Sequence, residues 1–475
     1  MADTVVKPTN FSELAKYIGI TQLVNLQTVI FGYTLGFTGP TLVDISLDLG
    51  LCPDDDVVCS DAALVASISA IVAGFGALFA GPGSDIFGRK PLLLVNAIFF
   101  GMGYMLMWVS TGFYSIIIAR AIQGWAMGVA SVVVNIYIGE ISPTNRRGML
   151  GSLFNVNISL GILLAYLWGL NASVDNGWWR TMAAVMLIPA AVGAYAVYRM
   201  PESPAYLNLK GKKEEAIAAN KYFNGPNAKL ENTDILGAGD GVSSIFNPKY
   251  RKAVAAGCLG VTMFALSGNN AVIAWIAVVL GLAGLDTQST SNGEIAFSAA
   301  QVFFAIVVAM DTSHRFGRRP LLITSCVGAG VSMVGMSVLV AAGNGDGTLI
   351  AMVCFIGFIT LGLSSLSWPY ASEVMPLPIR GQAMSLATVL FWFFTWATVE
   401  YFVVMVETFG ESSVFMFYAA ICFAGAGVMW RITLETKDKT EAEISMIFEG
   451  VVAAPAGSNP AAPLLAGDKN KVPAV

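Results

Sequence analysis

Charged side chains are scarce in this chain of 475 residues. Asp, Glu, Lys and Arg together make up 12% of the sequence, whereas soluble domains carry roughly 25%. Hydrophobic residues make up 56%, and the mean hydropathy is +0.68. This composition excludes a water-soluble globular protein and indicates an integral membrane protein.

Histidine and cysteine are also rare, with one His and six scattered Cys. They are too few for a zinc or haem site and form no Cys–His nucleophile pair. We therefore expect neither a metal nor another cofactor, and no enzymatic activity. The net charge of −5 and the lack of a basic stripe argue against nucleic acid as a partner.

Long apolar runs dominate the rest of the chain. Residues 1–19 are polar and lack the short apolar core and cleavage site of a signal peptide, so we expect a cytosolic N-terminal segment and an uncleaved first span. A helix needs about 20 apolar residues to cross the bilayer. The sequence predicts twelve such spans, which begin near Ile20, Ala62, Pro91, Phe113, Leu150, Thr181, Arg251, Ile295, Leu321, Thr348, Gln382 and Val414.

The distribution of basic residues predicts the orientation. Of the 26 Lys and Arg, only Arg120 falls inside a predicted span and only Arg180 lies in the loops opposite the termini. Basic loops stay in the cytosol, so both termini are predicted to be cytosolic, in either the plasma membrane or an internal one. Cys52 and Cys59 share an acidic loop on the opposite face, where an oxidising compartment permits a disulfide. Two free thiols are the alternative.

Two short motifs occur once in each half of the sequence. A Gly-Arg pair follows the second span and recurs after the eighth, and a Glu that precedes an Arg by a constant interval follows the fourth span and recurs after the tenth. The repeat predicts two six-span halves, 20–199 and 251–432. They are joined by a cytosolic linker with short helices, 200–250, and followed by a largely disordered cytosolic tail, 433–475. Repeated halves around a central site are typical of secondary transporters.

The charged residues of these motifs predict a gating network. Both signs occur in both halves, so the loops can pair when the cytosolic ends meet and separate when they part. Exposed pairs contribute only about 0–1 kcal/mol each, so a network is required. The alternative is that these cations only set topology. The candidate residues of this lock are Asp85, Arg89, Glu140, Arg147, Arg318, Glu373 and Arg380.

In this order and spacing, the motifs resemble those of the sugar porter branch of the major facilitator superfamily, which includes the facilitative glucose and hexose transporters. The resemblance extends over about residues 20–445 and rests mainly on Phe31-Gly32-Tyr33, Gly139-Glu140-Ile141-Ser142-Pro143, Pro201-Glu202-Ser203-Pro204, Leu266-Ser267-Gly268 and Glu435-Thr436-Lys437. It implies an all-α membrane protein with twelve transmembrane helices in two six-helix pseudo-symmetric bundles.

Departures from the family pattern bear on proton coupling. Proton-coupled members resemble Phe-Gly-Tyr-Asp in the first span, whereas this chain has Thr34, which carries no proton at physiological pH. Arg120 matches the family's fourth-span arginine, and a charge inside the membrane is costly, so it has either a coupling or a structural role. Glu400, inside the eleventh span, is either a substitute proton acceptor or a hydrated residue near the outer mouth.

The resemblance also implies a substrate site in the centre of the membrane. The candidate residues are Asn155, Asn270, Gln301, Trp368 and Trp392. The two tryptophans either stack on a ring-shaped solute or are core aromatics. Phe264, Ala265 and Thr360 replace polar residues of hexose carriers. Each solute hydroxyl group that is bound without a hydrogen-bond partner weakens binding by about 1–3 kcal/mol.

These observations predict an alternating-access carrier of a small polyhydroxylated solute, first of all a monosaccharide, that works as a facilitator. One alternative is a proton symporter for a sugar, polyol or cyclic acid that uses Glu400. Another is a sugar sensor that does not transport. The expected partners are the solute and the bilayer, and the sequence predicts no oligomeric state.

Overall fold

The computed structural model describes residues 11–52, 59–143, 146–170, 177–225, 247–312, 317–376, 379–437, 439, 443–444 and 447–448. All regular structure in these residues is helical. Residues 1–10, residues 226–246 of the linker and most of the predicted tail lie outside the described part of the chain. Arg147 lies at the start of a helix, but its side chain is also outside the described part.

The first half of the chain forms one bundle of helices. Its helices are α1 (Phe11–Gly36), α2 (Thr38–Leu49), α3 (Ser60–Phe87), α4 (Arg89–Trp108), α5 (Phe113–Ile141), α6 (Arg147–Gly169), α7 (Trp178–Val185) and α8 (Leu187–Arg199). Two of the crossings consist of consecutive helices, α1 with α2 and α7 with α8. The bundle thus has six crossings.

The second half forms the other bundle. Its helices are α11 (Arg251–Leu266), α12 (Asn269–Leu282), α13 (Thr287–Val307) with the π-helix η2 (Val308–Thr312), α15 (Arg318–Ala341), α16 (Gly345–Ile359) with the π-helix η3 (Thr360–Ser364), α17 (Ser365–Val374), α18 (Arg380–Phe409) and α19 (Glu411–Ile432). These also make six crossings, because α11 continues into α12 and α16 continues through η3 into α17. The protein is therefore an all-α, twelve-helix membrane protein.

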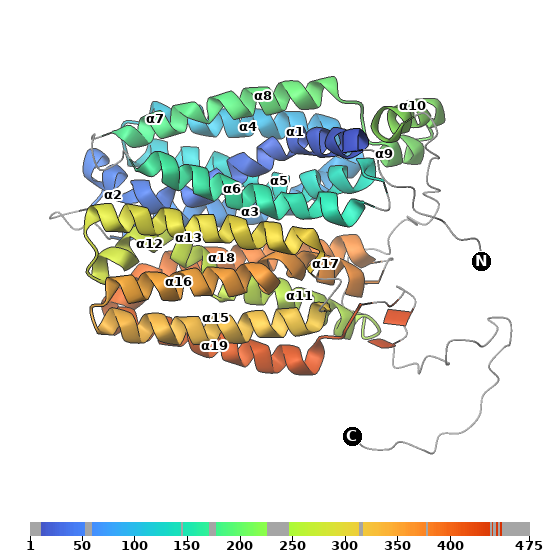
Figure 1. The fold of residues 1–475 in the computed structure, drawn as a ribbon. Coiled ribbons are helices and arrows are strands. Elements are labelled where there is room, and N and C mark those ends of the chain that lie inside the picture. The colour runs from blue at the N-terminus through green and yellow to red at the C-terminus, as the bar shows by residue number, and fades with distance from the viewer. Residues whose placement is uncertain are drawn as a thin grey trace, which may run out of the picture.

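Figure 1 shows the two bundles side by side, with their helices nearly parallel. The short helices α9 (Pro204–Leu209) and α10 (Lys213–Asn224) lie at one end, where α1 begins and α19 ends. We call this the linker end. The opposite end, where α2 is followed by α3, is called the disulfide end because Cys52 and Cys59 are bonded there.

α1 is the least apolar of the crossings. Among the described residues, eleven helical spans are long and apolar enough to cross a membrane, and α1 is not one of them. It buries five polar residues inside the protein, Thr21, Asn25, Gln27, Thr28 and Thr34. Several are satisfied internally. Gln27, for example, donates to the carbonyl oxygen of Leu93 and accepts from Asn96. These polar side chains of α1 thus face the interior of the protein. The helix has 26 residues and is therefore about 39 Å long at 1.5 Å per residue.

Glycines allow the closest helix contacts in the first bundle. A Cβ at Gly128 of α5 would lie 2.0 Å from the carbonyl oxygen of Ala73 in α3, and one at Gly161 of α6 would lie 2.1 Å from that of Val29 in α1. Small residues let membrane helices approach closely without a hydrophobic driving force between them. These two contacts fix the α3–α5 and α1–α6 pairs.

Gly128→Ala should therefore lower the stability of the protein. The added methyl group overlaps the backbone of α3, and overpacking of this kind costs about 1–3 kcal/mol. Gly101→Ala on α4 is the matched control, because a Cβ there meets nothing within 4 Å. Thermal unfolding in detergent should show a lower midpoint for Gly128→Ala only. Equal shifts in both variants would contradict the close contact.

Candidate functional site

A hydrogen-bonded amide joins the two bundles near mid-depth. Asn155 of α6 donates from Nδ2 to Oγ of Ser365 at 2.8 Å, and its Oδ1 accepts from Ser364 at 3.1 Å. Ser364 ends η3 and Ser365 begins α17. π-helical segments are often found at functional sites. The predicted substrate residue Asn155 thus contacts an irregular segment of the opposite half.

A second irregular segment carries Asn270. The helix breaks between α11 and α12 at Gly268, whose φ of 81° is in the left-handed region that favours glycine. Asn270 follows the break, is 6% exposed and donates to Thr395 of α18 at 3.1 Å. Discontinuous helices line the binding sites of many transporters, and this break places an amide against α18.

Several buried polar atoms of the second bundle have no hydrogen-bond partner among the described residues. They include Oε1 of Gln301 in α13, Oγ1 of Thr360 in η3 and Nε1 of Trp392 in α18. α13 packs against η3. A buried polar atom without a partner costs about 1–3 kcal/mol, so these atoms are available to the hydroxyl groups of a bound solute.

Aromatic rings gather around Trp392. Phe391 stacks on Phe264 at 5.5 Å and meets Trp368 and Trp392 edge to face at 5.7 and 5.1 Å. Trp392 also contacts Phe31 of the first bundle at 5.8 Å. This wall of rings can stack on a ring-shaped solute but offers few hydrogen bonds.

The two bundles also touch nearer the disulfide end. The hydroxyl of Tyr166 in α6 donates to the carbonyl oxygen of Ile273 in α12 at 2.9 Å. A Cβ at Gly39 of α2 would lie 2.8 Å from the Tyr166 ring and 3.2 Å from Cγ2 of Ile276. We call this contact of Gly39, Tyr166, Ile273 and Ile276 the tyrosine seam. It closes the centre of the protein towards the disulfide end.

Glu400 lies at another contact between the bundles. Its carboxylate accepts a hydrogen bond from Ser67 of α3, and α3 packs along α18. Glu400 is half-buried. It therefore links the two halves and is neither an isolated charge nor a fully exposed one.

Thr34 and Arg120, the residues predicted to bear on proton coupling, contact each other. Thr34 shares a 2.7 Å hydrogen bond with Tyr104, and its carbonyl oxygen accepts from Arg120 at 3.1 Å. Arg120 is 2% exposed and also donates to the carbonyl oxygen of Val65 and to Ser69 and Gln123. The groups bound to this guanidinium are uncharged, and they join α1, α3 and α5.

The charged motifs meet at the linker end. Arg89, 5% exposed, pairs with Glu140 at 3.0 Å and with the exposed Asp85 at 3.2 Å. In the second half, Arg318 pairs with Glu373 at 2.8 Å. Each pair joins the start of one helix to the end of the next crossing, in the same arrangement. The repeat in the sequence is therefore also a repeat in space.

Two further acidic residues belong to this network and were absent from the predicted set. Glu202 accepts hydrogen bonds from the backbone N–H of Lys90, and Glu435 accepts them from Arg318 and Arg319. Each carboxylate thus caps the helix that begins with the paired arginine, where the helix dipole favours negative charge. The signal was available, since Glu202 and Glu435 are as far apart in the sequence as Glu140 and Glu373.

The residue after each capping glutamate completes the symmetry. Ser203 donates to Glu140, and Thr436 donates to Glu373 at 2.6 Å. The charged pairs between these described residues lie within one half, whereas the sequence analysis pictured pairs that separate when the halves part. Arg380 donates to the carbonyl oxygen of Met375 at 3.0 Å. Its counterpart Arg147 lies outside the described side chains, so a lock between halves stays a prediction.

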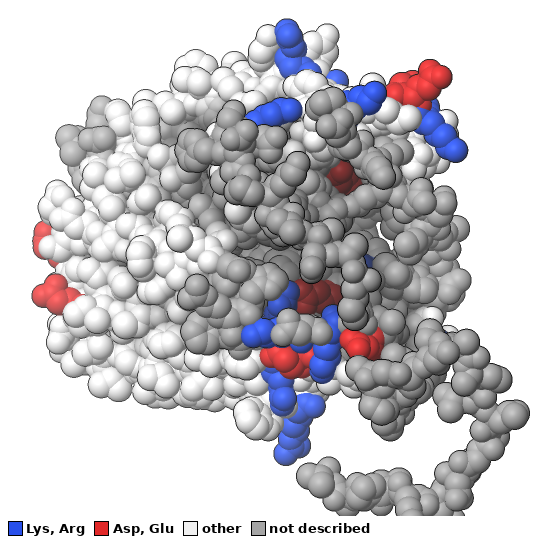
Figure 2. Space-filling view, turned by 45° about the vertical axis from the view of Figure 1, so that its right-hand side comes forward, with Lys and Arg blue, Asp and Glu red and all other residues white. Residues whose placement is uncertain are grey.

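Figure 2 shows where the charged side chains gather on the surface. Many lie over the linker end, and the adjoining side of the molecule is mostly white. A largely uncharged side wall is what the hydrocarbon of a bilayer requires.

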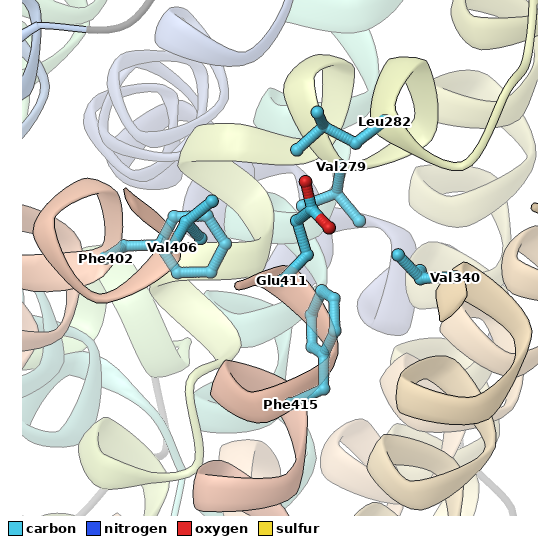
Figure 3. Close-up of a pocket in the computed structure, with 7 residues that line it drawn as sticks. All are labelled: Val279, Leu282, Val340, Phe402, Val406, Glu411 and Phe415. Atoms are coloured by element: carbon cyan, nitrogen blue, oxygen red, sulfur yellow. The ribbon is translucent and has the colours of Figure 1, made fainter. Parts of the chain in front are cut away.

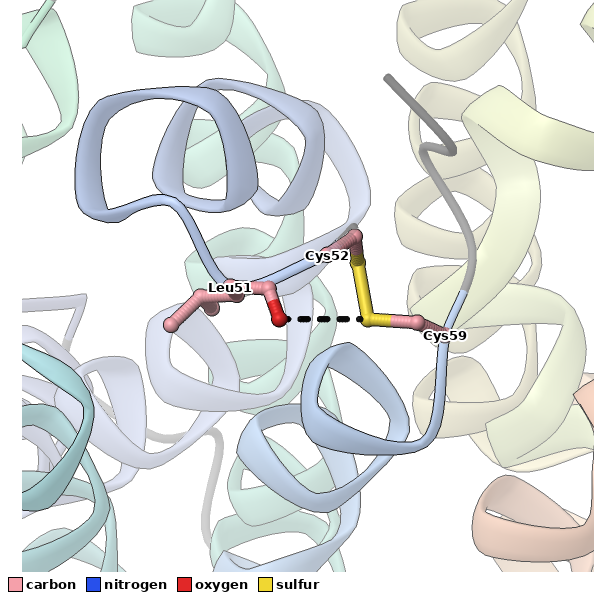
Figure 4. Close-up of a disulfide and its surroundings, with 3 residues drawn as sticks. All are labelled: Leu51, Cys52 and Cys59. Carbon is pink, nitrogen blue, oxygen red and sulfur yellow. Dashed lines mark hydrogen bonds between the residues drawn. A yellow bond between two sulfur atoms is a disulfide. The ribbon is translucent and has the colours of Figure 1, made fainter. Parts of the chain in front are cut away.

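The disulfide end is tied together covalently. Cys52 and Cys59 form a disulfide with a Cα–Cα distance of 5.7 Å. Figure 4 shows it between the end of α2 and the start of α3, with Sγ of Cys59 3.7 Å from the carbonyl oxygen of Leu51. Nearby, Arg180 pairs with Asp48. These contacts hold the first crossing against its neighbours.

A small crevice at the same end differs from the central site. Figure 3 shows Glu411 beside Val279, Leu282 and Phe415. The other lining residues are Val340, Phe402 and Val406. With Glu411 as the single polar side chain in this lining, the crevice does not suit a polyhydroxylated solute.

Two sets of contacts with the same orientation, one in each half, surround a central region with broken helices, an arrangement typical of secondary transporters. Residues 20–448 match the family model described as "Sugar (and other) transporter". The chain belongs to this family, and its fold is that of an alternating-access transporter of the major facilitator superfamily.

Individual relatives agree with this assignment. The chain is 30% identical to plastidic glucose transporter 4 of Arabidopsis thaliana, over 89% of this chain and 78% of that protein. It is 29% identical to the D-xylose transporter of Levilactobacillus brevis, over 76% and 82%. The inward open structure of the xylose transporter XylE from E. coli shares the fold with a TM-score of 0.76 at 22% identity, over 91% of this chain and 99% of that one.

Glu140→Gln should destabilise the first bundle. The substitution leaves the buried guanidinium of Arg89 without its carboxylate, and breaking such a pair costs about 3–5 kcal/mol. Asp85→Asn is the control, since its carboxylate is 72% exposed and such pairs contribute about 0–1 kcal/mol. Thermal unfolding in detergent should separate the two variants. A larger loss for Asp85→Asn would show that Glu140 is not the principal partner.

Proposed function

We propose that the protein carries a small polyhydroxylated solute, most directly a monosaccharide, across a membrane as a facilitator. The observation that carries this proposal is the set of unpartnered polar atoms in the bundle that also holds the aromatic cluster. Hydroxyl groups would satisfy Gln301, Thr360 and Trp392, and the rings of Trp368 and Phe391 would cover an apolar sugar face. The glucose and xylose transport named for the relatives supports a sugar as the substrate.

We further propose the orientation and the path. The linker end, with its basic residues, is cytosolic, and the disulfide end faces an oxidising exterior or lumen. Asn155 reaches across the halves to η3 and α17, so its contacts change both when the solute binds and when the bundles rock against each other. The tyrosine seam closes the exit towards the disulfide end when the linker end opens.

Facilitation without obligatory proton coupling follows from the surroundings of Arg120. Thr34 replaces the acidic residue of proton-coupled members, and the contacts of Arg120 with Thr34, Val65 and Ser69 are uncharged. A proton has no carboxylate to bind at this position. The remaining alternative within transport is proton symport through Glu400. The hydrogen bond that Glu400 accepts from Ser67 of the other bundle is compatible with this alternative.

Substitution of Gln301 tests the substrate site. Gln301→Leu keeps the size of the side chain and removes an amide whose Oε1 has no partner among the described residues. Loss of one hydrogen bond to the solute should raise KM about tenfold, with no loss of thermal stability. The control is Asn157→Ala, because Asn157 lies on the other side of α6 from Asn155 and bonds to the carbonyl oxygen of Leu153.

The measurement is uptake of labelled hexoses, pentoses, polyols and cyclic acids into proteoliposomes. An unchanged KM in Gln301→Leu, or an equal increase in Asn157→Ala, would place the solute elsewhere. Saturable binding without any uptake would favour a sensor over a carrier.

A proton gradient should leave the final level of accumulation unchanged. Facilitators equilibrate their solute, so uptake with and without the gradient should reach the same plateau in the wild type and in Glu400→Gln. Accumulation above equilibrium that follows the gradient and disappears in Glu400→Gln would contradict facilitation and establish the symporter.

A further inference from the structure

One carboxylate inside the second bundle has no role in the proposed site. Glu294 of α13 is 3% exposed, and its Oε1 has no hydrogen-bond partner among the described residues. Membrane-embedded carboxylates are rare and costly, and by default they point to function. Neither the lock nor the aromatic cluster uses Glu294.

The helices around Glu294 supply no cation. α13 packs against α6, α12 and α16. On these helices the only described basic position is Arg147, at the opposite end of α6, and α13 itself carries no Lys or Arg. The other titratable groups on these helices are Tyr166 of α6 and the exposed Asp346 and Cys354 of α16. An ionised Glu294 would thus be buried without compensation, which costs several kcal/mol.

The helix that carries Glu294 adjoins the tyrosine seam. Glu294 of α13 and Tyr166 of α6 lie on helices that pack against each other across the boundary between the halves, and Tyr166 makes the 2.9 Å bond to Ile273 that joins the two halves. Parting of the seam therefore removes the cover from this part of α13 and admits water to Glu294.

While the seam is closed, the side chains on the inner side of Glu294 are buried. Ser298 and Gln301 follow it on the same face of α13, one and two turns on, and are 0% and 4% exposed. The route to water opened by the seam leads towards the disulfide end. A proton that binds Glu294 thus enters and leaves through the same end.

We propose that Glu294 is a proton-binding site that must be occupied for the tyrosine seam to close. Ionised Glu294 keeps the seam open and hydrated, and protonated Glu294 is buried beneath Tyr166 as the seam closes. The acidity of the compartment at the disulfide end then sets how fast the empty or loaded carrier reorients. The proton is not a co-substrate, because it returns to the compartment from which it came. This inference rests on the proposed carrier function.

The test follows the seam itself and needs no sugar. Ile276 is 0% exposed and faces Gly39 across the seam, so Ile276→Cys reports opening through its reaction with a membrane-impermeant maleimide. The protein is reconstituted in proteoliposomes with the interior buffered at neutral pH, and the external pH is varied. The parent chain without Ile276→Cys gives the background from its other thiols.

Because the thiolate is the form that reacts with a maleimide, each Ile276→Cys labelling rate is divided by the rate of the same variant unfolded in SDS at the same pH. This ratio should rise with external pH by at most about tenfold per pH unit, the limit for a single proton. Glu294→Gln should give the low, closed-seam ratio at every pH. Glu294→Asp retains a carboxyl group and should retain the pH dependence. This second variant tests the proposal even if Glu294→Gln folds poorly.

Asp44→Asn is the matched control, because Asp44 of α2 is another carboxylate at the disulfide end with an unpartnered oxygen. It should leave the pH dependence intact. A pH-independent wild type, pH dependence that survives in Glu294→Gln, or its loss in Asp44→Asn would each overturn the proposal. Since no solute is present, none of these outcomes depends on whether the carrier takes a sugar.

Discussion

The structure depends on one constraint, that polar groups within a bilayer must find partners inside the protein. Arg120 meets it by gathering uncharged acceptors from three helices, and Arg89 meets it with a carboxylate from a neighbouring helix. In α1, Gln27 meets it through Leu93 and Asn96. Three of the buried polar atoms without a partner among the described residues, in Gln301, Thr360 and Trp392, are the ones proposed to bind the solute.

The same constraint distinguishes the helices that form a rigid framework from those that carry the candidate substrate site. Gly128 and Gly161 bring helices of the first bundle into backbone contact, which leaves little freedom within that bundle. The second bundle contains the break at Gly268 and the π-helix η3, together with four of the five candidate substrate residues. We infer that the first bundle acts mainly as a rigid wall and that the second supplies most of the recognition.

Hydropathy and internal repeats predicted much of this organisation. They identified the spans and the fold. Asn155 lies within α6 and contacts the irregular segment of η3, and Asn270 follows the break at Gly268; their role in binding stays a prediction. The sequence analysis did not single out Glu294, because the eighth span was predicted to begin near Ile295, one residue later. The structure begins α13 at Thr287, where Asp286 caps the helix by accepting from the backbone N–H groups of Gln288 and Ser289. The sequence did not predict the helix caps made by Glu202 and Glu435, because a motif shows which residues recur but not which backbone groups they bind.

The capping glutamates have one more consequence. Each stands directly after the sixth crossing of its half, so the segment through which the chain leaves a bundle is bound to the start of that bundle's third crossing. The first residues of the linker are thus bound beside the Arg89–Glu140 pair of one half, and the first residues of the tail are bound beside the Arg318–Glu373 pair of the other half. A load applied to either extension is transmitted to a single bundle, and the two bodies can turn against each other without straining these joints.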